Sequence, residues 1–249
     1  MIDLDEAGGV TVVRLAHGKV NALDLELLER LTATFAQLDV DSSRAVVLTG
    51  SGRAFSAGVD LWRIVDGGAA YLHAFLPALE AAFRAVFSIG KPVVAALNGH
   101  AIAGGAILAA ACDHRVMAAG TIGVTELQVG VPFPATALEI LANAYGGPQA
   151  RRAILAADTL EPAAALTTGR VDELSLPDTL LETAKARARQ LADRTTPDVF
   201  RLTKRQLQAP ALHRMTPDPR VLRLWLRAAE DGRLRRYMTA VSSGRPRRG

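Results

Sequence analysis

The fold is decided by the stretch Asn98-Gly-His-Ala-Ile-Ala-Gly-Gly-Ala-Ile-Leu-Ala-Ala-Ala-Cys112-Asp113 and its continuation Gly123-Val-Thr-Glu-Leu-Gln-Val-Gly-Val-Pro132. Glycines free the backbone for a turn, a helix of small residues follows, and a carboxylate, Glu126, comes just after the next strand. A second glycine-rich turn, Gly50-Ser-Gly-Arg-Ala-Phe-Ser-Ala-Gly-Val-Asp-Leu61, also follows an apolar strand. Two such turns can each direct a backbone N–H group at one oxygen atom, and a nearby carboxylate can then move protons on the polarised substrate.

The flanking sequence repeats strand, glycine-rich loop and helix. Apolar and β-branched runs predict strands at 10–15, 45–49, 93–97, 114–117 and 171–174, and helical spacing predicts helices at 24–41, 69–89 and 136–145. Pro77 is expected to kink the second of these helices. The alternation predicts an α/β fold with parallel strand pairing and helices outside the sheet.

After Pro177 the pattern changes to helix alone, with helical segments predicted at 178–194, 197–208 and 219–237. We divide the chain into a core at residues 1–194 and a helical C-terminal region at 195–249. Because Leu222, Leu224, Trp225 and Leu226 crowd together there, we expect this region to pack on another subunit.

Composition is that of a globular protein, with 49% apolar and 22% charged residues in 249 positions. One cysteine, Cys112, cannot form an intrachain disulfide, and the acidic N-terminus lacks the pattern of a signal peptide, so a cytoplasmic location is expected. The uncharged run 92–112 contains Pro92, Asn98 and His100, which favours a buried strand, a loop and a helix over a membrane span.

The net charge of +4 gathers late in the chain, at Lys204, Arg205, Arg233, Arg235, Arg236, Arg245, Arg247 and Arg248. Such a bias suits a polyanion, whether nucleic acid or a phosphorylated cofactor, but also a solvated basic tail. No aromatic residues alternate with the arginines, so nucleic acid is not the favoured partner. The five histidines do not fall at metal-ligand spacings, and no metal site is predicted.

Four segments share their pattern with one known family: Lys19-Val-Asn-Ala-Leu23, Ala54-Phe-Ser-Ala-Gly-Val-Asp-Leu61, Asn98-Gly-His-Ala-Ile-Ala-Gly-Gly105 and Gly169-Arg-Val-Asp-Glu-Leu174. Together they resemble the crotonase (enoyl-CoA hydratase/isomerase) superfamily over about residues 10–208. The resemblance implies a spiral of ββα units with a helical C-terminal trimerisation region, assembled as a homotrimer or a dimer of trimers. It also implies an acyl-CoA thioester substrate and no cofactor beyond the coenzyme A that the substrate carries.

The resemblance also implies roles for individual residues. The N–H groups of Ala57 and Gly104 would hold the thioester oxygen as an oxyanion hole, and Ile107 would form a wall of the acyl pocket. The coenzyme A arm would lie along a set of residues in or near the two upstream segments, with one lysine as a phosphate contact: Lys19, Ala54, Ser56, Gly58, Val59, Asp60 and Lys204.

Two positions bear on the reaction. Hydratases of this family carry a catalytic glutamate three residues after the oxyanion-hole glycine, where this chain has Ile107, and a second glutamate that corresponds to Glu126. Adding water is a task that two carboxylates share, whereas moving a double bond from the 3,4 to the 2,3 position needs one base. Glu126 sits in an apolar segment whose burial would raise its pKa toward neutrality. The motifs look most like those of Δ3,Δ2-enoyl-CoA isomerases of fatty acyl-CoA metabolism.

Two alternatives remain open at this point. One is enoyl-CoA hydratase or another crotonase chemistry, with a replacement acid for which Asp60 and Glu80 are candidates. The other is a non-catalytic binder of acyl-CoA or RNA, suggested by the missing glutamate and the basic C-terminus.

Overall fold

The computed structural model of the protein describes residues 1–242, and Arg245, Arg247 and Arg248 of the predicted basic tail lie outside the described residues. Two sheets form the centre of the molecule. The larger has six strands in the order β1 (Ile2–Ala7), β2 (Val10–Leu15), β3 (Ala45–Gly50), β5 (Val93–Leu97), β7 (His114–Met117) and β9 (Glu173–Leu174). The smaller has three, β4 (Ala54–Ser56), β6 (His100–Ile102) and β8 (Ile122–Gly123). The pair β1 and β2 is antiparallel, and the other pairs are parallel.

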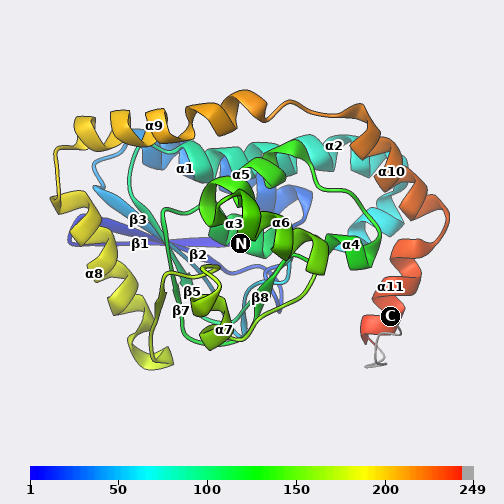
Figure 1. Cartoon of the computed structure of the whole chain (residues 1–249), viewed down its shortest axis with the longest axis horizontal. Helices are drawn as coiled ribbons and strands as arrows, with labels where there is room; N and C mark the ends of the chain where they lie inside the picture. The colour runs from blue at the N-terminus through cyan, green and yellow to red at the C-terminus, as the bar shows by residue number, and fades with distance from the viewer. Residues whose placement is uncertain (243–249) are drawn as a thin grey trace.

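Helices surround the two sheets (Figure 1). They are α1 (Leu25–Val40), α2 (Leu61–Ser88), α3 (Gly104–Ala110), α4 (Glu126–Val129), α5 (Ala135–Tyr145), α6 (Gly147–Ala156), α7 (Pro162–Thr167), α8 (Leu180–Asp193), α9 (Pro197–Arg214), α10 (Pro219–Glu230) and α11 (Arg233–Ser242). The order β3-β4-α2, β5-β6-α3, β7-β8-α4 repeats one unit three times, with one strand in each sheet and then a helix. This arrangement confirms the predicted spiral of ββα units with helices at the C-terminal end.

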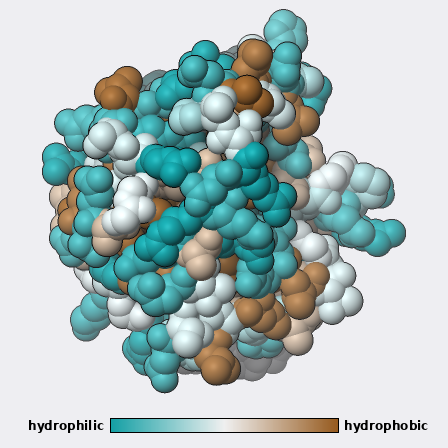
Figure 2. Space-filling view, turned by 90° about the vertical axis from the view of Figure 1, so that its left-hand side faces the viewer, coloured by the Kyte–Doolittle hydropathy of each residue, from teal (hydrophilic) through white to brown (hydrophobic). Residues whose placement is uncertain are grey.

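The central strands of the larger sheet, β2, β3 and β5, are buried on both faces because their residues alternate between two apolar clusters. Val12, Val47 and Val94 face Ala184 and Ala188 of α8. Their sequence neighbours join the main core with residues of α1 and α2, among them Val13, Leu48, Ala95, Leu31 and Phe83. Figure 2 views the molecule from the end that carries α8 and the start of α9, and shows a mostly hydrophilic surface with scattered apolar residues. The amphipathic α8 therefore closes the second face of the sheet.

The C-terminal helices pack on their own chain. Helix α10 contacts α2, and α11 contacts both α2 and α4. Trp225 is only 3% exposed, and its indole Nε1–H donates to the carbonyl of Pro132 at 3.0 Å. The expectation that the crowded residues of this region need another subunit to be buried is therefore wrong for Trp225, whereas Leu224 is 46% exposed.

Helix α2 is broken at a residue other than the predicted one. Gly68 has φ +59° and ψ −149°, whereas the helix continues through Pro77. A proline removes one intrahelical hydrogen bond and can remain in a helix that is held by packing, but a residue with positive φ lies outside the helical region altogether. Within residues 1–242, none of the helices has both the length and the apolar character that crossing a membrane requires.

Candidate active site

In the smaller sheet, the ends of β4, β6 and β8, one from each of three successive ββα units, lie side by side. Ser56 of β4 pairs with Ala101 of β6, and Ile102 of β6 pairs with Gly123 of β8. Because parallel neighbours in register end at the same edge, the residues that follow each strand lie beside one another. They surround a cavity of about 680 Å³ whose lining includes Ala57, Gly104 and Glu126.

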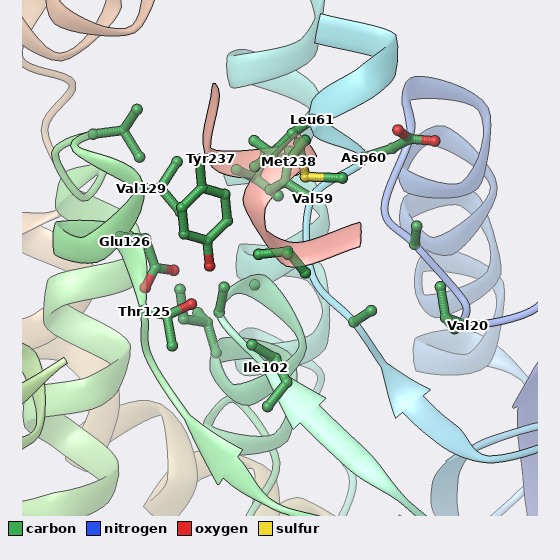
Figure 3. Close-up of a pocket in the computed structure, with 18 of the residues that line it drawn as sticks. Val20, Val59, Asp60, Leu61, Ile102, Thr125, Glu126, Val129, Tyr237 and Met238 are labelled. Atoms are coloured by element: carbon green, nitrogen blue, oxygen red, sulfur yellow. The ribbon is translucent and has the colours of Figure 1, made fainter. Parts of the chain in front are cut away.

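Glu126, the first residue of α4, is only 7% exposed, and Figure 3 shows its carboxyl group among the residues that line the cavity. One of its oxygens, Oε2, has no hydrogen-bond partner among the described residues. Burial raises the pKa of Glu126 to about 7, although backbone hydrogen bonds at Thr125 and Glu126 oppose the rise. A carboxyl group with this pKa is partly ionised at neutral pH and can both accept and return a proton.

The two turns that precede α2 and α3 approach each other through glycines. A Cβ atom on Gly58, whose φ is +83°, would lie 2.6 Å from the carbonyl oxygen of Ile102 and 3.2 Å from the nitrogen of Gly104. A Cβ atom on Gly105 would lie 2.3 Å from the carbonyl oxygen of Ser56. Only glycine allows the two turns to approach this closely. The close approach places backbone N–H groups of both turns beside the same cavity.

The N–H groups of the two predicted oxyanion donors, Gly104 and Ala57, differ in whether they already donate a hydrogen bond. The N–H group of Gly104, at the start of α3, donates to no backbone carbonyl within residues 1–242. The N–H group of Ala57 donates to the carbonyl of Val20 at 3.0 Å. A thioester oxygen that binds here must therefore share or replace the Val20 carbonyl as the acceptor at Ala57.

Ala54 and Ser56 do not line the cavity, in contrast to their predicted contact with coenzyme A. Ser56 is fully buried, where its hydroxyl donates to the carbonyl of Asn21 at 2.7 Å and accepts from the N–H of Gly58 at 3.2 Å. The Asn21 amide in turn donates to the carbonyl of Ala54 at 2.9 Å. These hydrogen bonds fix the conformation of the turn at Gly58 from the side that faces away from the cavity.

Lys204 is also not available as a phosphate contact within its own chain. It is only 5% exposed, and its ammonium group donates to Asp113 Oδ2 at 2.7 Å and to the carbonyl of Lys91 at 3.0 Å. The prediction from sequence is corrected for a physical reason: a buried ammonium group requires a charged partner, and Asp113 already supplies it. Lys19 and Gly58 do not line the cavity, and Lys19 is exposed, so their contact with the coenzyme A arm stays a prediction.

Val59, Asp60 and Ile107 line the cavity, and their contact with the substrate stays a prediction. Asp60 is committed to capping α2, because its Oδ1 accepts from the N–H groups of Trp62 and Arg63, both at 3.1 Å. Glu80 accepts from the Thr136 hydroxyl at 2.6 Å and does not line the cavity. Glu80 is therefore not at the cavity, and Figure 3 shows the Asp60 carboxyl group directed away from Glu126.

Other lining residues were not predicted from the sequence to belong to the site. They are mostly apolar and come from α2, α4, the segment after α4 and the two last helices: Leu79, Phe83, Val129, Val131, Trp225, Met238 and Val241. Polar residues also line the cavity beside Asp60 and Glu126, namely His100, Thr121, Thr125, Thr159 and Tyr237. The 3.6-residue period places Tyr237 and Val241 on one face of α11, but nothing in the period indicates which cavity that face covers. Among residues 1–242, no three His, Cys, Asp or Glu side chains are grouped as metal ligands would be.

The sequence was compared with protein families and with known proteins. The family model described as enoyl-CoA hydratase/isomerase matches residues 5–223. The chain belongs to this family. A putative enoyl-CoA hydratase of Thermus thermophilus is 39% identical over 210 residues, which cover 82% of each chain. The mitochondrial enoyl-CoA delta isomerase 1 of the mouse is 33% identical over 179 residues, which cover 70% of this chain and 62% of that protein.

The same likeness holds in three dimensions. The crystal structure of human mitochondrial delta3-delta2-enoyl-CoA isomerase superposes with a TM-score of 0.88 at 27% identity, over 98% of this chain and 99% of that chain. As a member of the enoyl-CoA hydratase/isomerase family, the protein acts on acyl-CoA thioesters. Glu126, with its unpaired Oε2, lines the cavity described above.

Proposed function

We propose that the protein isomerises 3-enoyl-CoA to 2-trans-enoyl-CoA, with Glu126 as the acid and base. The observation that carries the proposal is a buried carboxyl group with one unpaired oxygen in a cavity whose other carboxylate, Asp60, caps a helix. Ile107, which is 1% exposed, lines the same cavity without any group that could hold or move a proton.

In this mechanism the ionised Glu126 removes a proton from C2 of the substrate. The electron pair that is released delocalises through the C3–C4 double bond and onto the thioester oxygen. The N–H group of Gly104 stabilises the oxygen, together with that of Ala57 once the Val20 carbonyl yields. Glu126 then returns the proton to C4, which leaves the double bond between C2 and C3. Because Glu126 returns the same proton that it removed, the reaction consumes no water and needs no cofactor or second acid.

A second candidate is hydration of 2-enoyl-CoA, which the name of the Thermus thermophilus relative favours. Hydration needs one group to deprotonate water and a group that supplies a proton to C2. The apolar lining around Ile107 and the helix-capping role of Asp60 argue against this reaction in the present cavity.

The test is paired kinetics on 3-hexenoyl-CoA and crotonyl-CoA. We expect wild-type protein to isomerise the first without appreciable hydration of the second, and Glu126→Gln to lose isomerisation by roughly 10²-fold or more, as for a general base. Glu29→Gln, at an exposed position of α1, is the matched control and keeps wild-type rates. Robust hydration of crotonyl-CoA, or isomerisation that is indifferent to Glu126→Gln, would refute the proposal.

A further inference from the structure

The last helix within residues 1–242, α11, lies across the cavity and contacts both of its sides. On one side Arg233 donates to the carbonyl of Gly130 at 2.9 Å, at the end of the short helix that begins with Glu126. On the other side the Arg235 guanidinium lies 5.9 Å from the ring centre of Trp62, near the start of α2. Leu234 between them is fully buried. The helix is therefore a wall of the site, built by the same chain that supplies Glu126.

Three side chains of this wall line the cavity, namely Tyr237, Met238 and Val241. Figure 3 shows the Tyr237 ring hanging from α11 into the cavity, with its hydroxyl directed toward the side that carries Glu126 and Thr125. Tyr237 and Met238 are half-buried. The Tyr237 ring therefore borders the space beside Glu126 that an acyl chain would occupy.

We propose that Tyr237 is a specificity-determining residue that limits the length of the acyl chain the site accepts. The inference rests on the proposed function for the placement of the reacting carbons, and it adds the substrate class: enoyl-CoA thioesters whose chain ends before the Tyr237 ring. Met238 and Val241 extend the same barrier along α11.

The physical basis is the balance between apolar contact and excluded volume. Each methylene group that moves from water into an apolar environment strengthens binding roughly fourfold, or about 0.8 kcal/mol. A chain that fits against the ring gains this contact, whereas a longer chain has to displace the ring or leave its end in water. Replacing the ring with a methyl group removes the contact for short chains and opens the volume for long ones.

The test compares chain lengths in Tyr237→Ala and Tyr237→Phe, with Thr239→Ala as the control. Thr239 is exposed on the same helix, and its hydroxyl donates to the Arg235 carbonyl. The ratio of kcat/KM for 3-dodecenoyl-CoA to that for 3-hexenoyl-CoA is expected to rise about tenfold or more in Tyr237→Ala, which is the gain from about two methylene groups. It is expected to change less than about threefold in Tyr237→Phe, which keeps the ring, and in Thr239→Ala.

Binding of the saturated thioesters hexanoyl-CoA and dodecanoyl-CoA, measured by calorimetry, repeats the comparison without any reaction. A shift toward the longer chain in binding, in a protein that isomerises nothing, would leave this inference standing and remove the proposed function. Equal loss for both lengths in Tyr237→Ala, a shift toward the shorter chain, or the same shift in Tyr237→Phe would overturn the inference.

Discussion

Replacing Glu126 with glutamine is expected to stabilise the folded protein at neutral and alkaline pH, even though it removes the catalytic group. The ordinary pKa of a glutamate is 4.5, and burial raises that of Glu126 to about 7. The folded state therefore holds a proton on Glu126 over a range of pH in which the unfolded chain has released it. Glutamine has nearly the same shape but does not titrate, so it avoids the cost of an ionised group in an apolar cavity.

The sign and size follow from linkage between protonation and folding. Below pH 4.5 both states are protonated at Glu126, and the wild type carries no penalty. As the pH rises from 4.5 to about 7, stability is lost progressively, and above that range the loss is constant. At about 1.36 kcal/mol for each pH unit between the two pKa values, the full loss is about 3 kcal/mol. Glu126 is only 7% exposed, so solvent screens little of it.

Urea unfolding followed by circular dichroism at several pH values between 4 and 9 measures this difference. The free energy of unfolding of Glu126→Gln is expected to exceed that of the wild type by about 3 kcal/mol above pH 8, and the gap should close toward pH 4. Glu29→Gln, exposed on α1, serves as the control and should show no such change of gap with pH. A gap that stays constant with pH, or wild type and Glu126→Gln of equal stability at pH 8.5, would refute the reasoning.

Three further predictions concern the rest of the site. First, kcat/KM for isomerisation should rise with pH up to about 7 and then level off, because Glu126 must be ionised to act, and a pH–rate profile that falls across this range would contradict the assignment. Second, Gly58→Ala should lower the isomerisation rate by roughly 10²-fold, because its Cβ would press on the nitrogen of Gly104 at 3.2 Å; steady-state kinetics check this, and a wild-type rate would show that the turns tolerate the change. Third, Trp225→Phe should lower the free energy of unfolding by about 1–3 kcal/mol in urea titration, because the Pro132 carbonyl loses its partner; an unchanged midpoint would mean that water replaces the bond.

The position of the candidate site was predicted mainly from the glycine motifs, because the backbone freedom of a glycine depends only on its own position in the chain. Gly58, Gly104 and Gly105 allow two turns to touch, and this requirement leaves a recognisable pattern in the chain. Glu126 was predicted correctly as a buried carboxyl group because its neighbours in sequence are apolar. Ser56 was misread, because a small polar residue inside such a motif can face a ligand or hold the turn from behind, and its sequence neighbours are the same in both cases.

Contacts between distant segments were predicted poorly. Lys204 belongs to a basic region, yet its charge is neutralised by Asp113, a residue 91 positions earlier in the chain. The break in α2 falls at Gly68 because a backbone with positive φ costs glycine little, whereas the helix continues through Pro77, which lies between the buried Leu76 and Leu79. Each of these outcomes depends on which surfaces meet after folding, and no local pattern reports that.

The sequence by itself determined the repeat of strand, glycine-rich turn and helix, the isoleucine at position 107 and the carboxylate at 126, because each follows from backbone freedom or side-chain chemistry at its own position. The second, short strand of each ββα unit was implied only by the family resemblance. Only the tertiary structure decided that α11 of the same chain lies over the cavity, that Tyr237 points toward the Glu126 side, and that the Ala57 N–H group is held by Val20. These features join segments that are far apart in the chain, and their energies come from burial and hydrogen bonds that exist only when the whole core has formed.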